Sequence, residues 1–375
     1  MVHPRLAPSG GGQAVAAWAL QALRGHSKVS LLTLDPVDFP ALNSNFGTTL
    51  RACDFELIAA RGLSQRLIES VPSPPLARLE NALLARAAQR LSSTGHFDRF
   101  LCTNNEIDFG RKGVQYVHFP YAYLKRPLQD YRWYHRLPGA LALYRSLTDH
   151  LSGVSLERLR ENRALVNSGF IAGLYQEAHG VEADVVPPPV PGGFPETPWD
   201  VRRNVVVGVG RMHPCKRWIE AIEVVRRVRA EGLDVGLWIL GSKDDPEHLH
   251  ELQVRAEREP WCEVHVDLTR AELVRRVSQC RYGIHLMVEE HFGIAPAELQ
   301  RAGCLTFVHN SGGPVEIVDG DAEVLFDNDA EAAEKIARMV LDDTARAAAL
   351  SRLRVRAERY SEHAFMERIR QEVLG

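Results

Sequence analysis

The sequence predicts an α/β protein built from two doubly wound, Rossmann-like domains that face each other across a cleft. Along both halves of its 375 residues, short apolar runs alternate with amphipathic stretches. This alternation is typical of parallel strands joined by helical crossovers. A proline-rich segment, residues 187–198, interrupts the alternation near the midpoint, where proline excludes both a helix interior and a central strand. The length also suits two domains.

The expected strands and helices follow one another along the chain. In the first half we expect strands over residues 28–34, 55–59, 100–103 and 115–118, and helices over 13–23 and 76–91. In the second half we expect strands over 204–209, 235–240, 262–266, 282–287 and 304–309, alternating with helices over 218–231, 270–279 and 295–302. Before a glycine-rich turn at 9–12, only residues 1–3 could form a strand. Either the first strand is very short or the natural chain begins upstream.

The proline-rich linker sets the expected domain boundaries. Residues 1–190 are predicted to form an N-terminal domain and residues 191–355 a C-terminal domain. Residues 356–375 are predicted to form a helix that packs back on the N-terminal domain. The first 190 residues carry 20 basic and 16 acidic side chains, whereas the remainder carries 25 and 32. Ligands of such sheets bind at the carboxyl ends of the strands, so we look for chemistry there.

The composition excludes several classes of protein. A net charge of −3 argues against a nucleic-acid binder that works through bulk charge. The six cysteines form no C-x-x-C pair, which favours reduced thiols over disulfides or a zinc site. We find neither an apolar run of about 18 residues nor an N-terminal export signal. The expected location is therefore cytoplasmic, and contact with the membrane surface remains open.

The most informative segment runs from Glu289 to Glu298 and reads EEHFGIAPAE. Pro296 suits the first turn of a helix that begins near Ile294, so Glu290 lies in the preceding loop and Glu298 within the helix. The N–H groups at a helix N-terminus suit a phosphate, and the two carboxylates can hold two sets of hydroxyls on one ligand. A helix with a solvated acidic start is the alternative interpretation.

A second informative segment follows this helix. A buried strand leads into Ser311-Gly312-Gly313-Pro314, a turn that allows backbone to approach a ligand closely. Residues 289–318 together resemble the E-x7-E signature of retaining, two-domain (GT-B fold) glycosyltransferases of family four. The words HFGI and HNSGGP are most similar to the eukaryotic α-1,2-mannosyltransferases that extend the dolichol-linked oligosaccharide.

Further segments resemble the same branch, in the same order along the chain. They are His3-Pro4 with the glycines at 9–12, YVHFP at 116–120, VNS at 166–168, VVPPPV at 185–190, and GVGR at 208–211 with Lys216. The Glu that usually follows the glycines in this branch is Gln13 here. The resemblance spans residues 3 to about 320.

The resemblance implies a role for each matching residue. Glu298 would hold the ribose hydroxyls of a nucleotide-sugar donor. Glu290, with backbone N–H groups of residues 292–294, would hold the sugar hydroxyls and the distal phosphate. Gly11 and Gly12 would let the first domain close on the phosphate or acceptor, and His118 would contact the sugar or acceptor near the reacting carbon. The expected catalytic residues are His118, Arg211, Lys216 and Glu290, and the expected donor-binding residues are Gly11, Gly12, Arg211, Lys216, Phe292, Gly293, Ile294 and Glu298.

Arg211 and Lys216 follow a predicted strand of the second domain. Two cations at a strand end suit a diphosphate, because Arg binds oxygens bidentately and Lys supplies a point charge. The nearby Gly208-Val209-Gly210 also fits the start of a dinucleotide fingerprint, but His213 stands where its third glycine belongs. In the implied reaction the leaving phosphate accepts the acceptor's proton. Glu290 and Glu298 are therefore not read as an acid and a nucleophile.

We expect neither a metal nor a cofactor, since the nucleotide sugar is a substrate. The pairs Asp319/Asp321 and Asp327/Asp329 have the D-x-D spacing that can hold Mg²⁺. Both pairs follow the Ser-Gly-Gly-Pro turn, and we interpret them as acidic surface turns.

Residues 121–136 form the most basic and aromatic segment of the sequence. Such a mixture suits a membrane–water interface, stacking on an acceptor sugar or nucleic acid, or an ordinary helix and loop. If the acceptor is lipid-linked, this segment is the candidate membrane-facing side.

The predicted function is a retaining hexosyltransferase. The best choice of donor is GDP-mannose, and the acceptor is a hydroxyl of a glycan or a lipid-linked glycan, with no nucleic-acid partner. One alternative is a UDP-sugar-dependent transferase (glucose or N-acetylglucosamine) that acts on a small molecule or polysaccharide. The others are a nucleotide-sugar epimerase or phosphorylase of similar fold and an inactive sugar-nucleotide-binding protein.

Overall fold

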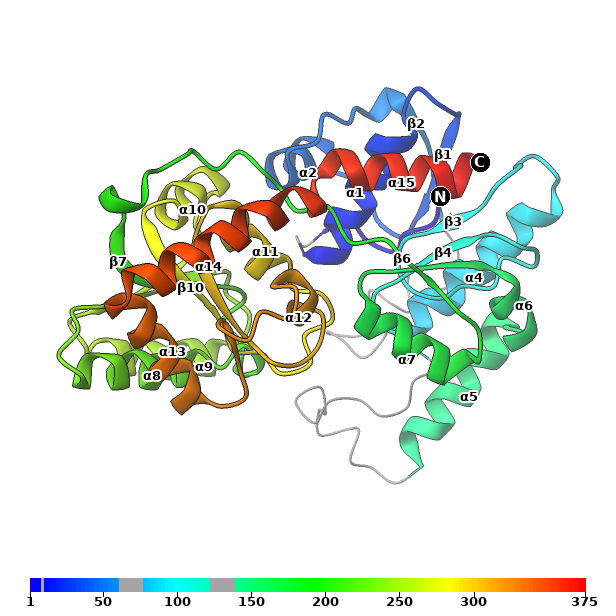
Figure 1. Ribbon diagram of the computed structural model, residues 1–375. Helices are drawn as coiled ribbons and strands as arrows, with labels where there is room; N and C mark the ends of the chain where they lie inside the picture. Colours follow the sequence, from blue (N-terminus) through cyan, green and yellow to red (C-terminus); the bar gives the residue numbers. More distant parts are fainter. Residues whose placement is uncertain (8–9, 61–76, 122–138) are drawn as a thin grey trace. The chain divides into compact units, whose positions relative to one another are not determined.

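The computed structural model describes residues 1–7, 10–60, 77–121 and 139–375 (Figure 1). The chain divides into two compact units, and each is described by itself. Unit 1 comprises Met1–Pro189 together with Glu362–Gly375, and unit 2 comprises Val190–Ser361. Ser9 of the glycine-rich turn, and most of the basic aromatic segment 121–136, lie outside the described residues.

The sheet of unit 1 is parallel throughout. Strand β1 (Val29–Thr33) pairs with β2 (Phe55–Ala59). Four further strands are neighbours in the order β3 (Leu101–Cys102), β4 (Val114–Val117), β5 (Arg163–Val166) and β6 (Asp184–Val185). Val2 bridges Leu32 on one side and Cys102 on the other, and so joins β1 to β3. Residues 1–3 therefore act as the very short first strand.

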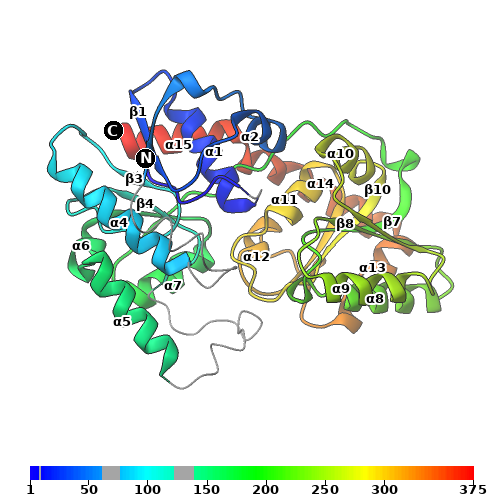
Figure 2. The same cartoon turned by 180° about the vertical axis from the view of Figure 1, so that it is seen from behind.

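Helices of unit 1 pack on this sheet, and the last of them comes from the C-terminus. α15 (Glu362–Leu374) lies beside α1 (Gly11–Leu23) in both views (Figures 1 and 2). Its Phe365, Ile369 and Val373 recur every fourth residue and are buried in the same cluster as Leu20 of α1. The remaining helices are α2 (Phe39–Phe46), α4 (Ala77–Ser93), α5 (Ala140–Ser152), α6 (Leu156–Glu161) and α7 (Gly169–His179), with the short 3₁₀ segment η1 (Ala52–Asp54).

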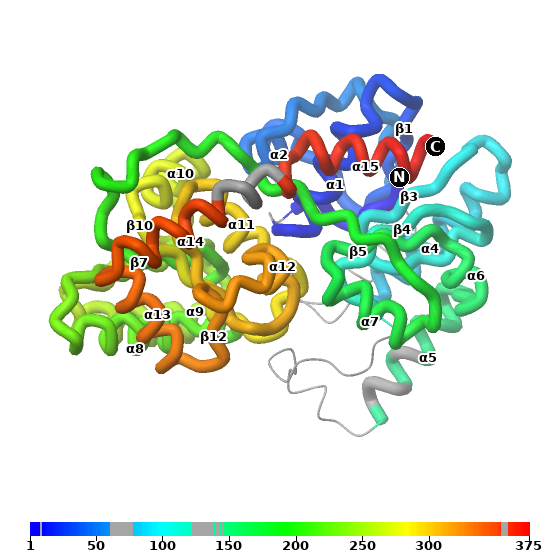
Figure 3. Tube along the Cα trace, in the orientation of Figure 1, coloured from blue at the N-terminus to red at the C-terminus, as the bar shows by residue number. Residues whose placement is uncertain are grey.

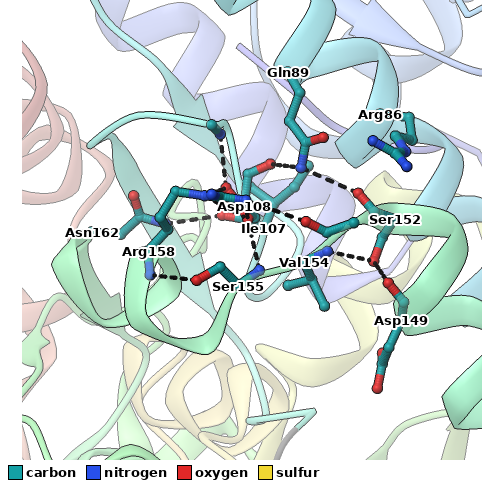
Figure 4. A network of polar contacts seen from close by, with 12 residues as sticks. Arg86, Gln89, Ile107, Asp108, Asp149, Ser152, Val154, Ser155, Arg158 and Asn162 are labelled. Atoms are coloured by element: carbon teal, nitrogen blue, oxygen red, sulfur yellow. Dashed lines mark hydrogen bonds and ion pairs between the residues drawn. The ribbon is translucent and has the colours of Figure 1, made fainter.

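A buried carboxylate fixes the segment that follows β3. Asp108 accepts N–H groups from Ser155 at 2.9 Å and Gly110 at 2.7 Å, and Arg158 Nη2 at 2.8 Å (Figure 4). Burial alone would raise the pKa of Asp108, but the bonds from Arg158 and the two N–H groups hold that pKa below its ordinary value. Residues 103–110 are thereby tied to the α5–α6 connection.

Unit 2 contains a six-stranded parallel sheet in the order β12-β11-β10-β7-β8-β9. The strands are β7 (Arg203–Val209), β8 (Gly236–Gly241), β9 (Cys262–Val266), β10 (Cys280–His285), β11 (Leu305–His309) and β12 (Leu325–Phe326). Helices α8 (Trp218–Ala230), α9 (Pro246–Ala256) and α13 (Asp329–Leu341) pack on one face, and α10 (Arg270–Val277) and α11 (Ile294–Arg301) on the other (Figure 3). The short α12 (Pro314–Ile317), α14 (Asp343–Arg356) and the 3₁₀ segments η4 (Trp199–Val201), η5 (Pro214–Lys216) and η6 (Ala357–Tyr360) complete the unit.

Most expected elements occur within one to three residues of their predicted bounds. The expected strand over 100–103 shortens to Leu101–Cys102, and the expected helix over 270–279 ends at Val277. The first helix begins at Gly11 instead of residue 13. The two-residue strands β6 and β12 were not expected, because they are too short to show a periodic pattern.

Candidate functional site

The candidate site of unit 2 lies where β7, β10 and β11 end. These strands are neighbours in a parallel sheet, so their carboxyl ends share one edge. The loops after them carry Lys216, Glu290 and the Ser311-Gly312-Gly313 turn. The fold therefore brings the most informative segments of the sequence to one edge of the sheet.

Lys216 and Glu290 form an ion pair between the loops after β7 and β10. Lys216 Nζ contacts Glu290 Oε2, and it also lies 3.2 Å from Met287 Sδ. The side chains are only 13% and 16% exposed. His285, the last residue of β10, places its Nε2 3.4 Å from the same carboxylate oxygen.

The ionised form of Glu290 is strongly favoured. Burial by itself would raise the pKa of Glu290, but the charge of Lys216 and the neighbouring His285 hold it well below its ordinary value. Burial lowers the pKa of His285, so this ring is neutral at neutral pH. Glu290 is thus a carboxylate paired with one full positive charge, that of Lys216.

The loop of Glu290 rests on the Ser311-Gly312-Gly313 turn. Gly313 N–H donates to Glu290 O at 2.8 Å, and Ser311 Oγ accepts the N–H of Glu289 at 2.8 Å. Gly312 has a φ of +72°, and a Cβ there would overlap the backbone of Glu290. A Cβ on Gly313 would lie 2.5 Å from His291 O. Only glycines allow this backbone-to-backbone packing.

The N-terminus of α11 follows directly. Gly293 is the N-cap residue with φ +98°, and no described side chain caps the helix. The first N–H groups of a helix have no partner within it, and they carry its positive dipole end. Phe292 is buried against Tyr360, with ring centroids 5.3 Å apart. Phe292, Gly293 and Ile294 directly follow the loop of Glu290 in the chain. The helix end at which they lie is suited to an anion.

Glu298, which lies on α11, forms a second ion pair. Arg270 Nη1, from the first residue of α10, donates to Glu298 Oε1 at 2.5 Å. Burial raises the pKa of Glu298 even though Arg270 opposes the shift. The structure therefore does not join the two carboxylates in one cluster but gives each its own cation.

Arg211 and Lys216 pair with different carboxylates. The guanidinium of Arg211 is 58% exposed and pairs with Asp244 at 2.7 Å, while its carbonyl accepts Trp218 Nε1. The backbone of Arg211 is thus fixed, and its side chain points to the loop after β8.

The predicted residues of unit 1 gather around His118. His118 Nε2 lies 3.1 Å from Thr103 O, and the backbone N–H groups of His118 and Phe119 donate to Asn105 Oδ1 at 2.7 and 3.0 Å. A Cβ on Gly12 would lie 3.5 Å from His118 Nε2, so the start of α1 runs close to the imidazole. Gly11 is exposed beside it at the first position of the helix.

Sequence reasoning missed three of these site residues. His285 lies inside an apolar run and has the pattern of a buried strand end. Arg270 is separated from Glu298 by 28 residues, and no local signal links them. Asn105, buried with φ +64°, follows β3 in a polar TNNE stretch. That run of polar residues at the end of an apolar strand was the available signal.

The acidic D-x-D pairs serve structural contacts. Asp321 accepts Arg352 Nε at 2.7 Å, Asp329 pairs with Arg217 at 3.0 Å, and Asp327 accepts Asn310 Nδ2. Within the described ranges, no three His, Cys, Asp or Glu side chains are grouped as metal ligands would be. The expectation of a metal-free site remains a prediction.

No helix among the described residues combines the length and apolar character needed to cross a bilayer. All six cysteines are free thiols.

The fold of the chain is that of two-domain glycosyltransferases. WaaG, a glycosyltransferase involved in lipopolysaccharide biosynthesis, aligns over 100% of this chain and 99% of its own with a TM-score of 0.71 and 15% identity. HepE of Anabaena, in a crystal structure with UDP, aligns over 99% and 97% with a TM-score of 0.68 and 14% identity. The predicted class, two Rossmann-like domains of the GT-B type, is confirmed.

The sequence comparisons identify the domain more closely. Residues 194–359, which lie within unit 2, match the family described as glycosyl transferases group 1. The GDP-Man:Man(3)GlcNAc(2)-PP-Dol alpha-1,2-mannosyltransferase of Xenopus tropicalis is 30% identical over 123 residues, which are 31% of this chain and 25% of that protein. The human protein of the same name is 30% identical over 153 residues, 36% of this chain and 31% of the relative. The predicted resemblance to this branch is confirmed, over less than a third of each relative's length.

Proposed function

We propose that the protein is a retaining glycosyltransferase that moves mannose from GDP-mannose to a hydroxyl of a glycan or lipid-linked acceptor. The observation that carries the proposal is the Lys216–Glu290 pair beside the N-terminus of α11. A nucleotide sugar presents a diphosphate and sugar hydroxyls, and these residues offer a cation, helix N–H groups and a carboxylate. Unit 2 would hold the donor, and unit 1, with His118 and Gly12, would meet the acceptor.

The chemistry follows from where charge develops. The bond between the sugar carbon and the phosphate oxygen breaks, and negative charge grows on the leaving diphosphate. Lys216 and the N–H groups of residues 292–294 would stabilise that charge, and one such preorganised donor is worth about 3–4 kcal/mol. The acceptor oxygen bonds to the same face of the sugar, and its proton passes to the leaving phosphate. Glu290 would hold the sugar hydroxyls through this step.

Arg211 would have to break its ion pair with Asp244 before it could bind the diphosphate. This pair is solvent-exposed, and such pairs contribute only about 0–1 kcal/mol, so exchanging the carboxylate for a phosphate has a small cost. Arg211 would then bind two phosphate oxygens with its planar fork.

A lipid-linked acceptor would bring unit 1 to a membrane surface. α5 exposes Leu143, Leu147 and Leu151, which recur every fourth residue and form one apolar stripe. The basic aromatic residues 121–136 precede this helix in the sequence. We expect anionic liposomes to sediment the wild type but not a variant with Ser at the three leucines and Ala at Lys125, Arg126, Arg132 and Arg136. Equal sedimentation of both proteins contradicts peripheral membrane contact.

The donor is tested with a set of nucleotide sugars. We expect GDP-mannose and GDP to raise the melting temperature more than UDP-glucose, UDP-N-acetylglucosamine or their diphosphates, because a ligand of the native state stabilises it. A preference for a uridine donor contradicts the mannose assignment and favours the UDP-sugar transferase. With an acceptor that turns over, an α-configured product from the α-linked donor supports retention, and activity in excess EDTA supports metal independence.

A further inference from the structure

Two asparagine side chains hold the peptide groups of His118. Asn105 Oδ1 accepts the N–H groups of His118 and Phe119 at 2.7 and 3.0 Å, and Asn167 Nδ2 donates to His118 O at 3.2 Å. Both asparagines are buried. They follow β3 and β5, the strands on either side of β4, and His118 directly follows β4. The start of the loop after β4 is therefore fixed from both neighbouring strands.

Asn105 has a backbone conformation that few side chains adopt. Its φ is +64°, in the left-handed region where asparagine is tolerated and glycine is favoured. Its own N–H donates to Tyr116 O at 3.0 Å, so the backbone and the side chain of Asn105 both bind the end of β4. Glycine would satisfy the backbone alone, whereas asparagine also supplies an oxygen that accepts two N–H groups. The side chain of Asn105, and not only its φ, therefore shapes the loop of His118.

The same turn also contacts the imidazole of His118. Thr103 O lies 3.1 Å from His118 Nε2, and the ring packs on that of Tyr116 with centroids 5.1 Å apart. A carbonyl oxygen only accepts hydrogen bonds, and a neutral imidazole carries one N–H. The proton of the neutral ring therefore lies on Nε2, and Nδ1 is its accepting nitrogen.

We propose that Asn105 is a positioning residue that acts through His118. It fixes the peptide of His118 so that the ring meets Thr103 O, and this contact selects the Nε2–H tautomer. The effect on catalysis rests on the proposed function, in which His118 meets the acceptor. The tautomer itself is a property of the protein without substrate, so the two effects can be tested separately.

The tautomer is measured on protein labelled with nitrogen-15 histidine, by long-range proton–nitrogen correlation spectra at about pH 8, above the ordinary pKa of histidine. A His118→Gln sample identifies the signals of His118 among the 15 histidines. We expect a single Nε2–H tautomer in the wild type. Asn105→Gly removes the side chain without straining φ, and we expect both tautomers of His118 to be populated in this variant.

Two further variants separate the accepting oxygen from other roles of this turn. Asn105→Asp keeps an accepting oxygen, so we expect it to retain the Nε2–H tautomer. This variant also keeps the test decisive if the glycine variant does not fold. Asn104→Ala is the matched control, because Asn104 lies in the same turn but its amide donates to Asn81 Oδ1 at 3.0 Å. The control should keep the wild-type tautomer.

The catalytic effect is measured with an acceptor that turns over. Misplacing a reacting group by about 1 Å can cost about 100-fold in rate, so Asn105→Gly should lower kcat by about 10- to 100-fold. The KM for GDP-mannose should stay within about threefold of wild type, since unit 2 is the proposed holder of the donor. Asn105→Asp should recover most of the lost rate, and Asn104→Ala should show the wild-type rate.

The outcomes separate the two proposals. A single Nε2–H tautomer in Asn105→Gly, or mixed tautomers in Asn105→Asp or in the wild type, overturns the positioning of His118 by Asn105. A changed tautomer with an unchanged kcat overturns the part of Asn105 in catalysis. A wild type that neither binds GDP-mannose nor turns it over overturns the proposed function, whereas the tautomer measurement still decides whether Asn105 positions His118.

Discussion

Glu290 and Glu298 lie eight residues apart on either side of one helix start, yet their environments are opposite. Both are buried, and each contacts one cation. The pKa of Glu290 lies well below its ordinary value, whereas that of Glu298 lies above it. Glu290 has Lys216 and His285 at the same oxygen, while Glu298 contacts Arg270, and the charges of Arg270 and Arg301 do not outweigh the effect of burial.

Their different environments indicate what each carboxylate is suited to do. Glu290 is a permanent anion in a loop, next to helix N–H groups, and it keeps Lys216 in place where the proposed diphosphate develops charge. Glu298 sits within the helix, where ionisation is only weakly supported, so its interactions with neutral hydroxyls matter more. In the proposed reaction, one motif would thus supply a charged catalytic partner and a binding group.

Lys216→Ala should produce the largest effect in this comparison. The variant leaves Glu290 as a buried anion without its main partner, which costs about 3 kcal/mol of unfolding free energy. It also removes a preorganised donor worth about 3–4 kcal/mol, so kcat should fall by about 100- to 1000-fold. Urea unfolding and initial-rate kinetics measure the two effects.

The control for this variant is Arg211→Ala. Arg211 is exposed, so its loss should lower activity by a similar amount but change the unfolding free energy by less than about 1 kcal/mol. Rates within threefold of wild type for Lys216→Ala would refute its role. An equal loss of unfolding free energy in both variants would show that the buried Lys216–Glu290 pair contributes no more to stability than the exposed Arg211–Asp244 pair.

Gly312→Ala should disturb Glu290 and spare Glu298. An added Cβ overlaps the backbone of Glu290, and φ is +72°, so we expect a loss of about 2–3 kcal/mol in stability. Gly320→Ala is the matched control, because φ is +67° there but a Cβ meets no described atom within 4 Å. The control should lose only about 1 kcal/mol. Equal losses in the two variants would mean that backbone strain, not loop contact, sets the effect.

Glu290→Gln tests the lowered pKa through pH. A group whose folded pKa is depressed stabilises the protein above its unfolded pKa, about 4.3, and loses that contribution as pH falls through the folded value. Wild type should therefore exceed the variant in unfolding free energy most at pH 6–7. The advantage should shrink below about pH 4.3. A difference that does not change between pH 7 and pH 3 contradicts the account.

Glu298→Gln should show the opposite and smaller dependence. A raised folded pKa favours the protonated form, so its contribution is present below about pH 4.3 and is lost as pH rises through the folded value. Relative to wild type, the neutral variant should become more stable as pH rises through this window. Denaturant titrations from pH 4 to 8 measure how the difference in unfolding free energy between variant and wild type changes with pH. A change of the same sign for both variants would contradict the opposite pKa shifts of the two carboxylates.

Much of this arrangement could be predicted from the sequence. Apolar runs such as 204–209 located the strands, and parallel topology brought Lys216 and Glu290 to one edge. The ion pair itself could not be predicted, since it depends on how far the loop after β10 folds back over Gly312 and Gly313. The pairing of Arg270 with Glu298 depends on the packing of α10 against α11. The raised pKa of Glu298 comes from burial, and no short pattern reports burial of a helical glutamate.

The first unit was harder to predict at its site. His118 was chosen by resemblance, but its setting depends on Asn105, whose left-handed backbone lets one side chain accept two successive N–H groups. A polar residue after an apolar strand has many ordinary roles, and only the folded chain distinguishes them.

The most direct test of the central claim is a calorimetric titration of GDP-mannose into the wild type and into Lys216→Ala. We expect saturable 1:1 binding to the wild type and affinity at least tenfold weaker in the variant, because the proposed donor is held by the Lys216–Glu290 pair. Equal affinity for both proteins, or no binding of GDP-mannose to the wild type, would contradict the proposed role of this pair.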